Sequence, residues 1–250
     1  MVDLWMQPGG GRMRIGVDGS WSPYFRTAGP GRAHRIVIDL PARHQEAAVE
    51  VMGDGPVDLL GWGVDRRGSG VLVEGHGVNG ATIDMLGNLD QGILRRDLAA
   101  APPALIILAF GTNEAADSSM TEDAYTARLT EKVRMLKRLS PGSGILLLGA
   151  PDSGRSASGP GSCRGVRPLP SLDEVQAAQR RVAQAERIGH WDWAREITGG
   201  VCRLSGLSQA SPPLMQRDHV HFTADGYRLT AERLYEYIVR QATTPATRNT

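Results

Sequence analysis

The sequence predicts an α/β protein, a three-layer α/β/α sandwich with a parallel sheet, preceded by a small antiparallel β unit. Short β-prone runs separated by glycine and proline fill residues 12–75, without a helical period. After residue 76, apolar strands alternate with helical patterns, which is typical of a parallel sheet covered on both faces. We therefore predict a β unit over residues 12–76 and an α/β domain over residues 77–242.

In the β unit, each expected strand is bounded by residues that favour turns. Pro30-Gly31 and Gly53-Asp54-Gly55-Pro56 are examples of such turns. The first residues, Met1–Arg14, lack the apolar segment of a signal peptide and are expected to be a tail or a truncated start. The expected strands are Met13–Val17, Ile36–Leu40, Ala47–Met52, Val57–Gly61 and Val71–Glu74.

In the α/β domain, apolar runs and helical periods alternate. Thr121 is a candidate N-cap, and Ser171 with Glu174 has the spacing of a capping box. Residues 152–170 are rich in Gly, Ser and Pro and are expected to form a long loop, and Gly199–Arg217 is expected to be irregular. The expected helices are Ala81–Ala101, Thr121–Ser140, Ser171–Arg187 and Thr223–Gln241, and the expected strands are Leu105–Phe110, Ile145–Ala150 and Ile188–Trp193.

Composition narrows the classes of function. The chain has 28 Lys and Arg against 27 Asp and Glu, without a basic stripe, so no nucleic-acid partner is expected. No run of 18 apolar residues predicts a membrane span. The two cysteines, Cys163 and Cys202, lie in loop-like sequence, and the sequence leaves open whether they pair or are free thiols.

Asp218 and His221 are the clearest candidates for a catalytic pair. An aspartate three residues before a histidine, in a polar loop that opens a helix, can place a carboxylate against an imidazole. The carboxylate then fixes the tautomer of the ring and stabilises its protonated form, so the histidine acts as a general base. Asp-x-x-His also occurs by chance, so the assignment of a catalytic pair depends on two further segments.

Two glycine-containing turns supply candidate hydrogen-bond donors. Gly111-Thr112-Asn113-Glu114 follows the expected strand Leu105–Phe110, and open α/β sheets bind ligands at the carboxyl ends of their strands. The Asn113 amide can donate there to a developing oxyanion. Gly80 is expected to open the helix Ala81–Ala101, where free N–H groups and the helix dipole favour negative charge. These segments supply a base, its orienting carboxylate and two donors, but no evident nucleophile.

With these segments in this order, the chain resembles the SGNH hydrolases, also called GDSL-type esterases and lipases. That family has four blocks: Gly-Asp-Ser with the nucleophile, a Gly turn, a Gly-x-Asn turn, and Asp-x-x-His near the C-terminus. Val78-Asn79-Gly80-Ala81, Gly111-Thr112-Asn113 and Asp218-His219-Val220-His221 match the second, third and fourth blocks. The resemblance covers residues 77–241.

The resemblance implies a three-layer fold, hydrolysis of an ester through an acyl-serine intermediate, and no cofactor. It assigns His221 as the base, Asp218 as its partner, and the Gly80 N–H and the Asn113 side chain as oxyanion donors. Residues 12–76 are similar to the β insertions of members that deacetylate cell-wall or plant polysaccharides. The implied substrate is a small ester or an acetylated carbohydrate.

The first block of the family is not found in this sequence. Gly53-Asp54-Gly55 has glycine where the serine belongs. Asp18-Gly19-Ser20 follows a strand-like run, so Ser20 is the best substitute, but the prolines and glycines after it exclude the helix that a nucleophile turn requires. We therefore expect the first block to lie upstream of the β unit, outside this chain. Its absence would leave an exposed strand edge in the parallel sheet.

Other polar residues have simpler interpretations. His219 is interpreted as a loop residue that faces away from the catalytic pair and touches substrate at most. Together with Asp218 and His221 it lacks a third ligand of clear spacing, so no metal site is expected. Trp191-Asp192-Trp193 is interpreted as strand packing, with Asp192 solvated or capping. Glu114 is expected to form hydrogen bonds within its loop, and a supporting role beside the site stays open.

Two functions of different classes remain. The first is a carbohydrate or peptidoglycan O-acetylesterase whose serine is missing from this chain or supplied irregularly. The alternative is a non-catalytic or truncated module that binds a glycan. The sequence leaves open the acyl group, the alcohol, the oligomeric state and the cellular compartment.

Overall fold

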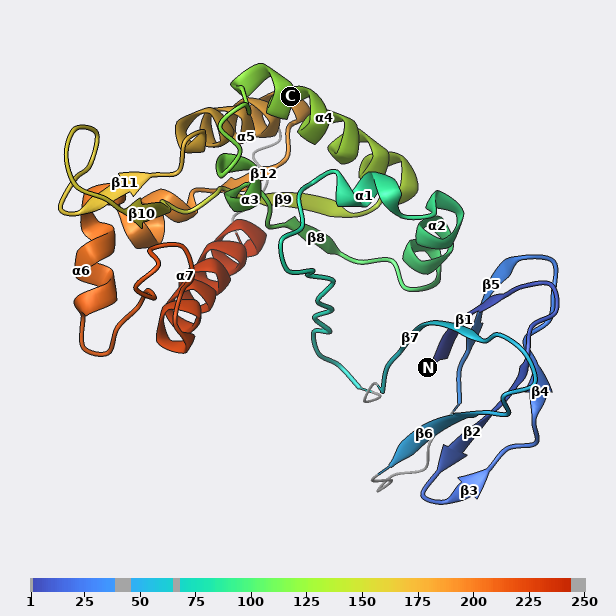
Figure 1. Ribbon diagram of the computed structural model, residues 1–250. Coiled ribbons are helices and arrows are strands. Elements are labelled where there is room, and N and C mark those ends of the chain that lie inside the picture. The colour runs from blue at the N-terminus through green and yellow to red at the C-terminus, as the bar shows by residue number, and fades with distance from the viewer. Residues whose placement is uncertain (1, 39–45, 65–67, 244–250) are drawn as a thin grey trace. The chain divides into compact units, whose positions relative to one another are not determined.

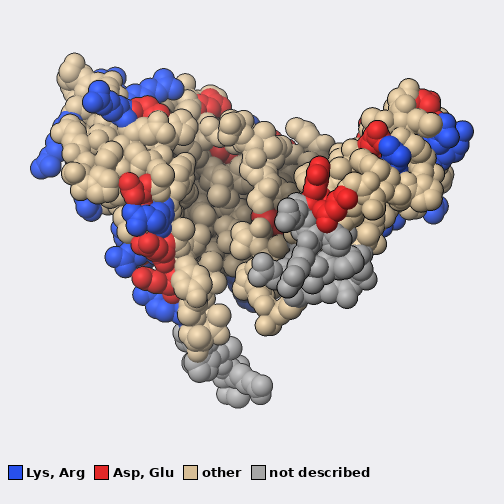
Figure 2. Space-filling model, turned by 90° about the horizontal axis from the view of Figure 1, so that it is seen from below, with Lys and Arg blue, Asp and Glu red and all other residues tan. Residues whose placement is uncertain are grey.

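The computed structural model describes residues 2–38, 46–64 and 68–243 (Figure 1). The chain divides into two compact units, Met1–Gly75, here unit 1, and His76–Thr250, here unit 2. Within the described residues, no helix has both the length and the apolar character needed to cross a membrane. Figure 2 shows acidic and basic side chains interspersed on the face that it presents.

Unit 1 consists of two antiparallel sheets, as the sequence predicts. The first has the strand order β5-β1-β7, and in the second β2 pairs with β3, β4 and β6. Apolar side chains of β1 and β2 together form the core of the unit: Val2, Leu4, Met13 and Ile15. The strands are β1 Val2–Met6, β2 Arg12–Val17, β3 Ser20–Trp21, β4 Phe25–Arg26, β5 Arg32–Ile36, β6 Ala47–Val51 and β7 Asp58–Trp62.

Three expectations for this part of the chain are corrected. The start is not a tail, because β1 pairs with strands on both sides and buries Leu4. The strand expected at Ile36–Leu40 lies earlier, at Arg32–Ile36, and residues 39–40 fall outside the described ranges. The strand expected at Val71–Glu74 is absent: this segment has no regular secondary structure, and Val71 is 91% exposed. A β-prone run forms a strand only where a neighbouring strand completes its hydrogen bonds.

Unit 2 contains the predicted parallel sheet, with β9 Gly144–Leu148 between β8 Leu105–Leu108 and β12 Gly189–Trp191. Side chains alternate along β9, so Ile145 and Leu147 join one apolar cluster while Leu146 and Leu148 join another. Figure 1 shows α4 and α5 on one side of the sheet and α7 on the other. Both faces of the sheet are therefore covered, as its continuous apolar strands predict.

The helices of unit 2 follow the expected order with three corrections. The first is that Gly199–Arg217, expected to be irregular, contains the helices η2 and α6. Thr121 accepts a hydrogen bond from Ala124 N and caps α4 as predicted. Ser171 does not cap α5, because its hydroxyl donates to Asp117 O instead. The helix expected over Ala81–Ala101 is two helices, since the Asp90 side chain caps a new start. The helices are α1 Met85–Asn88, α2 Gln91–Ala100, α3 Thr112–Ala115, α4 Glu122–Leu139, α5 Leu172–Glu186, π-helix η1 Ala194–Thr198, 3₁₀ helix η2 Val201–Arg203, α6 Leu204–Gln209 and α7 Ala224–Thr243.

The expected long loop over residues 152–170 contains a short antiparallel hairpin, β10 Gly154–Ser156 and β11 Val166–Pro168. A disulfide joins Cys163, in the loop between β10 and β11, to Cys202 in η2. The sequence left the pairing of these cysteines open, because their proximity depends on how the hairpin folds back. The disulfide fixes the hairpin to the segment that leads into α6.

Candidate active site

Asp218 and His221 form the hydrogen bond that their spacing predicts. His221 Nδ1 lies 2.7 Å from Asp218 Oδ2. The other carboxylate oxygen accepts hydrogen bonds from the backbone N–H groups of Val220 and His221, at 2.9 and 3.0 Å. Partial burial acts to raise the pKa of Asp218, but the hydrogen bonds from His221 and Val220 outweigh it and the pKa is lowered. The carboxylate is therefore held ionised and aligned with the ring.

The residues around His221 fix its backbone and leave its ring accessible. His221 O accepts a hydrogen bond from Gln216 N at 2.7 Å, and the next residue, Phe222, is buried and stacks on Trp193 with 5.3 Å between ring centroids. The His221 side chain itself is 64% exposed. Its Nε2 forms no hydrogen bond with any residue of the described ranges, so this nitrogen is open to a substrate or a nucleophile.

His219 lies in the loop, as predicted, but it is buried rather than open to solvent. It is only 7% exposed, with a backbone φ of 60°. Its carbonyl accepts a hydrogen bond from Gly154 N at 2.9 Å, and its Nδ1 lies 3.4 Å from Ser156 Oγ. His219 therefore attaches the Asp218–His221 loop to β10, and its burial argues against contact with substrate.

Gly80 and Asn113 are far apart in sequence but lie in neighbouring segments, Gly80 in a turn and Asn113 in the short helix α3, where the sequence predicted a turn. Asn113 Nδ2 donates to Ala81 O at 2.8 Å, which uses one of its two N–H groups. Gly80 is exposed in a turn with φ +73°, and its N–H donates to no acceptor among the described residues. The first helix after Gly80 begins only at Met85, so the expected support from a helix dipole at Gly80 is wrong.

Glu114 connects these two segments. It is 1% exposed, and its carboxylate accepts hydrogen bonds from Ile83 N at 2.7 Å and Gly111 N at 2.9 Å. Burial raises the pKa of this carboxyl group. The bond to Gly111 confirms the expected contact within its own loop. The bond to Ile83 was not predicted, because only the fold brings that residue close.

Both candidate pairs contact segments that follow the carboxyl ends of β8 and β9. Gln179 on α5 joins these ends, since it donates to Phe110 O and accepts from Ala150 N, both at 2.7 Å. The Asn113 turn follows Phe110 directly, and the segment after Ala150 leads to Gly154, which contacts the histidine loop. This is the edge at which open α/β sheets bind ligands.

In the part of the chain that the structure describes, no nucleophile is hydrogen-bonded to the pair. Within the described ranges, no hydroxyl or thiol forms a hydrogen bond with the His221 ring. Ser20 begins β3, opposite Val17 in a tight hairpin, with Asp18 and Gly19 at positive φ. No helix follows it, as predicted, so Ser20 lacks the setting of a nucleophile turn.

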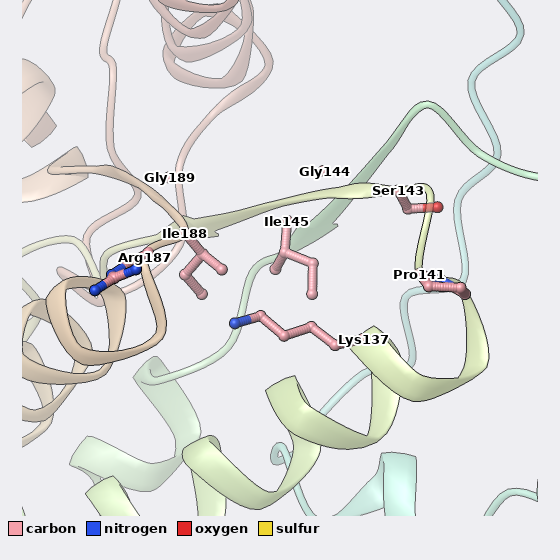
Figure 3. A pocket seen from close by; sticks show the side chains of 8 residues that line it. All are labelled: Lys137, Pro141, Ser143, Gly144, Ile145, Arg187, Ile188 and Gly189. Carbon is pink, nitrogen blue, oxygen red and sulfur yellow. The ribbon is translucent and has the colours of Figure 1, made fainter. Parts of the chain in front are cut away.

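A pocket of unit 2 lies at the opposite edge of the sheet (Figure 3). Its volume is about 460 Å³, and its walls include Gly144 and Gly189, the first residues of β9 and β12. Lys137 in its wall already donates to Glu186 O and Oε2, at 2.6 and 3.0 Å. Because the pocket lies at the amino ends of these strands, it is separate from the candidate catalytic residues. Within the described ranges, no cluster of three or more His, Cys, Asp or Glu side chains is arranged to hold a metal ion.

Comparison with known proteins identifies the family. Residues 27–229 match the GDSL-like Lipase/Acylhydrolase family, and the chain belongs to it. The resemblance to SGNH hydrolases in the sequence is thereby confirmed. No curated protein matches the chain significantly.

Solved structures of the same class are similar to this chain. A peptidoglycan O-acetylesterase is 26% identical, with a TM-score of 0.71, over 96% of this chain and 64% of that chain. The chain thus spans less than two thirds of that protein's length. A lipase/acylhydrolase from Enterococcus faecalis is 20% identical with a TM-score of 0.44, covering 64% of this chain and 71% of that one. An acetyl xylan esterase is 14% identical with a TM-score of 0.47, covering 64% and 78%.

Proposed function

We propose that this chain provides the base and part of the oxyanion hole of a serine-type O-acetylesterase that acts on peptidoglycan or another acetylated carbohydrate. The observation that carries this proposal is the 2.7 Å bond between His221 Nδ1 and Asp218 Oδ2 on an exposed ring. Membership of the acylhydrolase family supports ester hydrolysis. Similarity to a peptidoglycan O-acetylesterase over nearly the whole chain supports the substrate class.

In the proposed reaction, His221 Nε2 removes the proton from a serine hydroxyl as its oxygen bonds to the ester carbonyl carbon. Asp218 accepts a hydrogen bond from Nδ1–H and stabilises the positively charged ring. The carbonyl oxygen becomes negative and accepts hydrogen bonds from Gly80 N–H and the remaining N–H of Asn113. As the ester C–O bond breaks, His221 gives its proton to the leaving alcohol. Water then repeats these steps on the acyl-serine and releases the carboxylic acid.

The free edge of β8 offers a place for the segment that brings the serine. Among the described strands β8 pairs only with β9, and Ile107 in its centre is 42% exposed, although strands of parallel sheets are usually buried. We propose that a strand ending in the nucleophilic serine pairs with this edge and completes a three-layer domain. If it runs parallel to β8, its carboxyl end lies beside the Gly111–Asn113 turn.

Unit 1 is proposed to hold the glycan chain. The similarity to the peptidoglycan O-acetylesterase covers 96% of this chain and therefore includes most of unit 1. This unit has an apolar groove of about 230 Å³, lined by Ala47, Val49, Leu59 and Trp62. Trp62 is 60% exposed, and its flat indole offers an apolar face to a sugar ring. Trp62→Ala should weaken binding to acetylated polysaccharide without changing the hydrolysis of a small ester.

The hydrolysis of p-nitrophenyl acetate tests the proposal. We compare this chain with one extended by the sequence encoded upstream of Met1. The extended chain should hydrolyse the ester, and its His221→Ala variant and the present chain should show only background rates. An extended chain that is no faster than the present one would refute the esterase. Glycan binding without hydrolysis would then favour the non-catalytic module.

A further inference from the structure

Glu114, in α3 next to Asn113, contacts both segments that hold the proposed oxyanion donors: the turn around Gly80 and the Gly111–Asn113 segment, here called the donor loops. It is almost fully buried, yet both of its carboxylate oxygens accept backbone hydrogen bonds, from Ile83 N and Gly111 N. Ile83 lies three residues after Gly80, and Gly111 lies two residues before Asn113. One carboxylate thus contacts both donor loops.

Few other hydrogen bonds hold these loops together. The Asn113 side chain donates to Ala81 O, and the Ile83–Glu114 bond is the neighbouring link between the same two loops. Neither Gly80 nor Asn113 lies in a strand that pairs with the other loop. The distance between the two donors therefore depends strongly on Glu114.

We propose that Glu114 is a positioning residue of the oxyanion hole, whose carboxylate holds the Gly80 loop against the Asn113 turn. This inference rests on the proposed esterase function. A carboxylate suits this task because both of its oxygens are acceptors. Glutamine has one acceptor oxygen, and its amide group would face one of the two backbone N–H groups, so Glu114→Gln should release one loop at nearly constant side-chain volume.

Protonation of Glu114 should weaken its hydrogen bonds to Ile83 and Gly111, so its titration reports on the contact between the two segments. Burial raises the pKa of its carboxyl group above 4.5, against the hydrogen bonds that lower it, and the charge of Asp84 raises it further. Tyr125, buried against the same site, is the other titratable group that Glu114 influences. As the pH falls through the raised pKa, one oxygen gains a proton and the acceptance of two N–H groups is weakened.

An NMR titration of this chain tests the positioning without any catalysis. The amide signals of Ile83 and Gly111 should move with one shared midpoint above pH 4.5, and the Asn113 side-chain NH₂ signals should move with them. Glu114→Gln should abolish this shared step. The matched control, Glu232→Gln on the exposed face of α7, should keep it. Separate midpoints, or Asn113 signals that are identical in wild type and Glu114→Gln, would overturn the inference.

Activity of the extended chain separates this inference from the proposed function. Glu114→Gln should lower kcat for p-nitrophenyl acetate about 10- to 100-fold, with a smaller change in KM, because small displacements of catalytic groups cost such factors. Glu232→Gln should leave both constants unchanged. An active extended chain whose kcat is insensitive to Glu114→Gln would overturn the positioning role. An inactive extended wild type would refute the proposed function, and the titration alone would then decide whether Glu114 holds the loops.

Discussion

Replacing Cys163 and Cys202 together by serine should lower the free energy of unfolding of unit 2 by up to about 4 kcal/mol. The disulfide joins residues separated by 39 positions. Closing a loop of this length removes an entropy of roughly 13 cal/mol/K from the unfolded chain, which is about 4 kcal/mol at 25 °C in the chain-entropy description. This loss is a large part of the stability of an ordinary domain.

Hydrogen exchange of the buried β9 amides is the suitable assay, because the chain has two units and the signal must report unit 2 alone. The slowest of these amides exchange through global unfolding, so their rates give its free energy. The loop between β10 and β11 should also exchange faster in the variant, since Cys163 anchors it to η2.

Reduction provides the matched control for this prediction. A reducing agent should destabilise the wild type by the same amount and leave the double serine variant unchanged. Wild-type protein with two free thiols, or a variant whose β9 amides exchange at the wild-type rate, would show that the disulfide does not constrain unit 2.

The remaining predictions concern the site, the sheet edge and pH. In an active extended chain, Asn113→Ala should lower kcat about 10²–10³-fold, the usual loss for one oxyanion donor, and should change substrate affinity little; an equal loss in binding would contradict its role. Ile107→Lys on the free edge of β8 should reduce activation by a serine-bearing segment supplied as a separate chain, measured as ester hydrolysis at increasing segment concentration. Burial lowers the pKa of His190 below 6.5, and its Nε2 has no hydrogen-bond partner among the described residues. The unfolded state therefore binds the proton more readily, so stability should fall as the pH drops below about 6.5, and His190→Gln should flatten this part of the stability profile measured by denaturant unfolding.

Most of the fold could be predicted from local sequence. Continuous apolar runs identified β8 and β9, and helical periods identified α4, α5 and α7, because the interior of an α/β domain requires those patterns. The predictions failed where a distant partner decides the outcome. Val71–Glu74 has strong β propensity but no neighbouring strand, and Ser171 donates to Asp117 O rather than capping its helix.

In the candidate site, too, contacts between residues close in sequence could be predicted, and contacts between distant segments could not. The Asp218–His221 contact was predictable, since three residues of a loop bring the carboxylate to the ring whatever the rest of the chain does. The family blocks also placed Gly80 in a turn, as observed, whereas Asn113, expected in a turn, lies in α3. The sequence could not show that Glu114 joins these segments, because Ile83 is 31 residues away from it and comes close only through the packing of unit 2.

The sequence by itself thus determined the family, the main strands and helices of the α/β domain, and the pairing of Asp218 with His221, because each depends on patterns of residues close in the chain. The tertiary structure alone decided the Cys163–Cys202 disulfide, the burial of His219 and the hydrogen bond between Ile83 and Glu114. These features join segments distant in sequence. Their contacts arise only when the sheet and its covering helices bring those segments together, and no local pattern specifies that geometry.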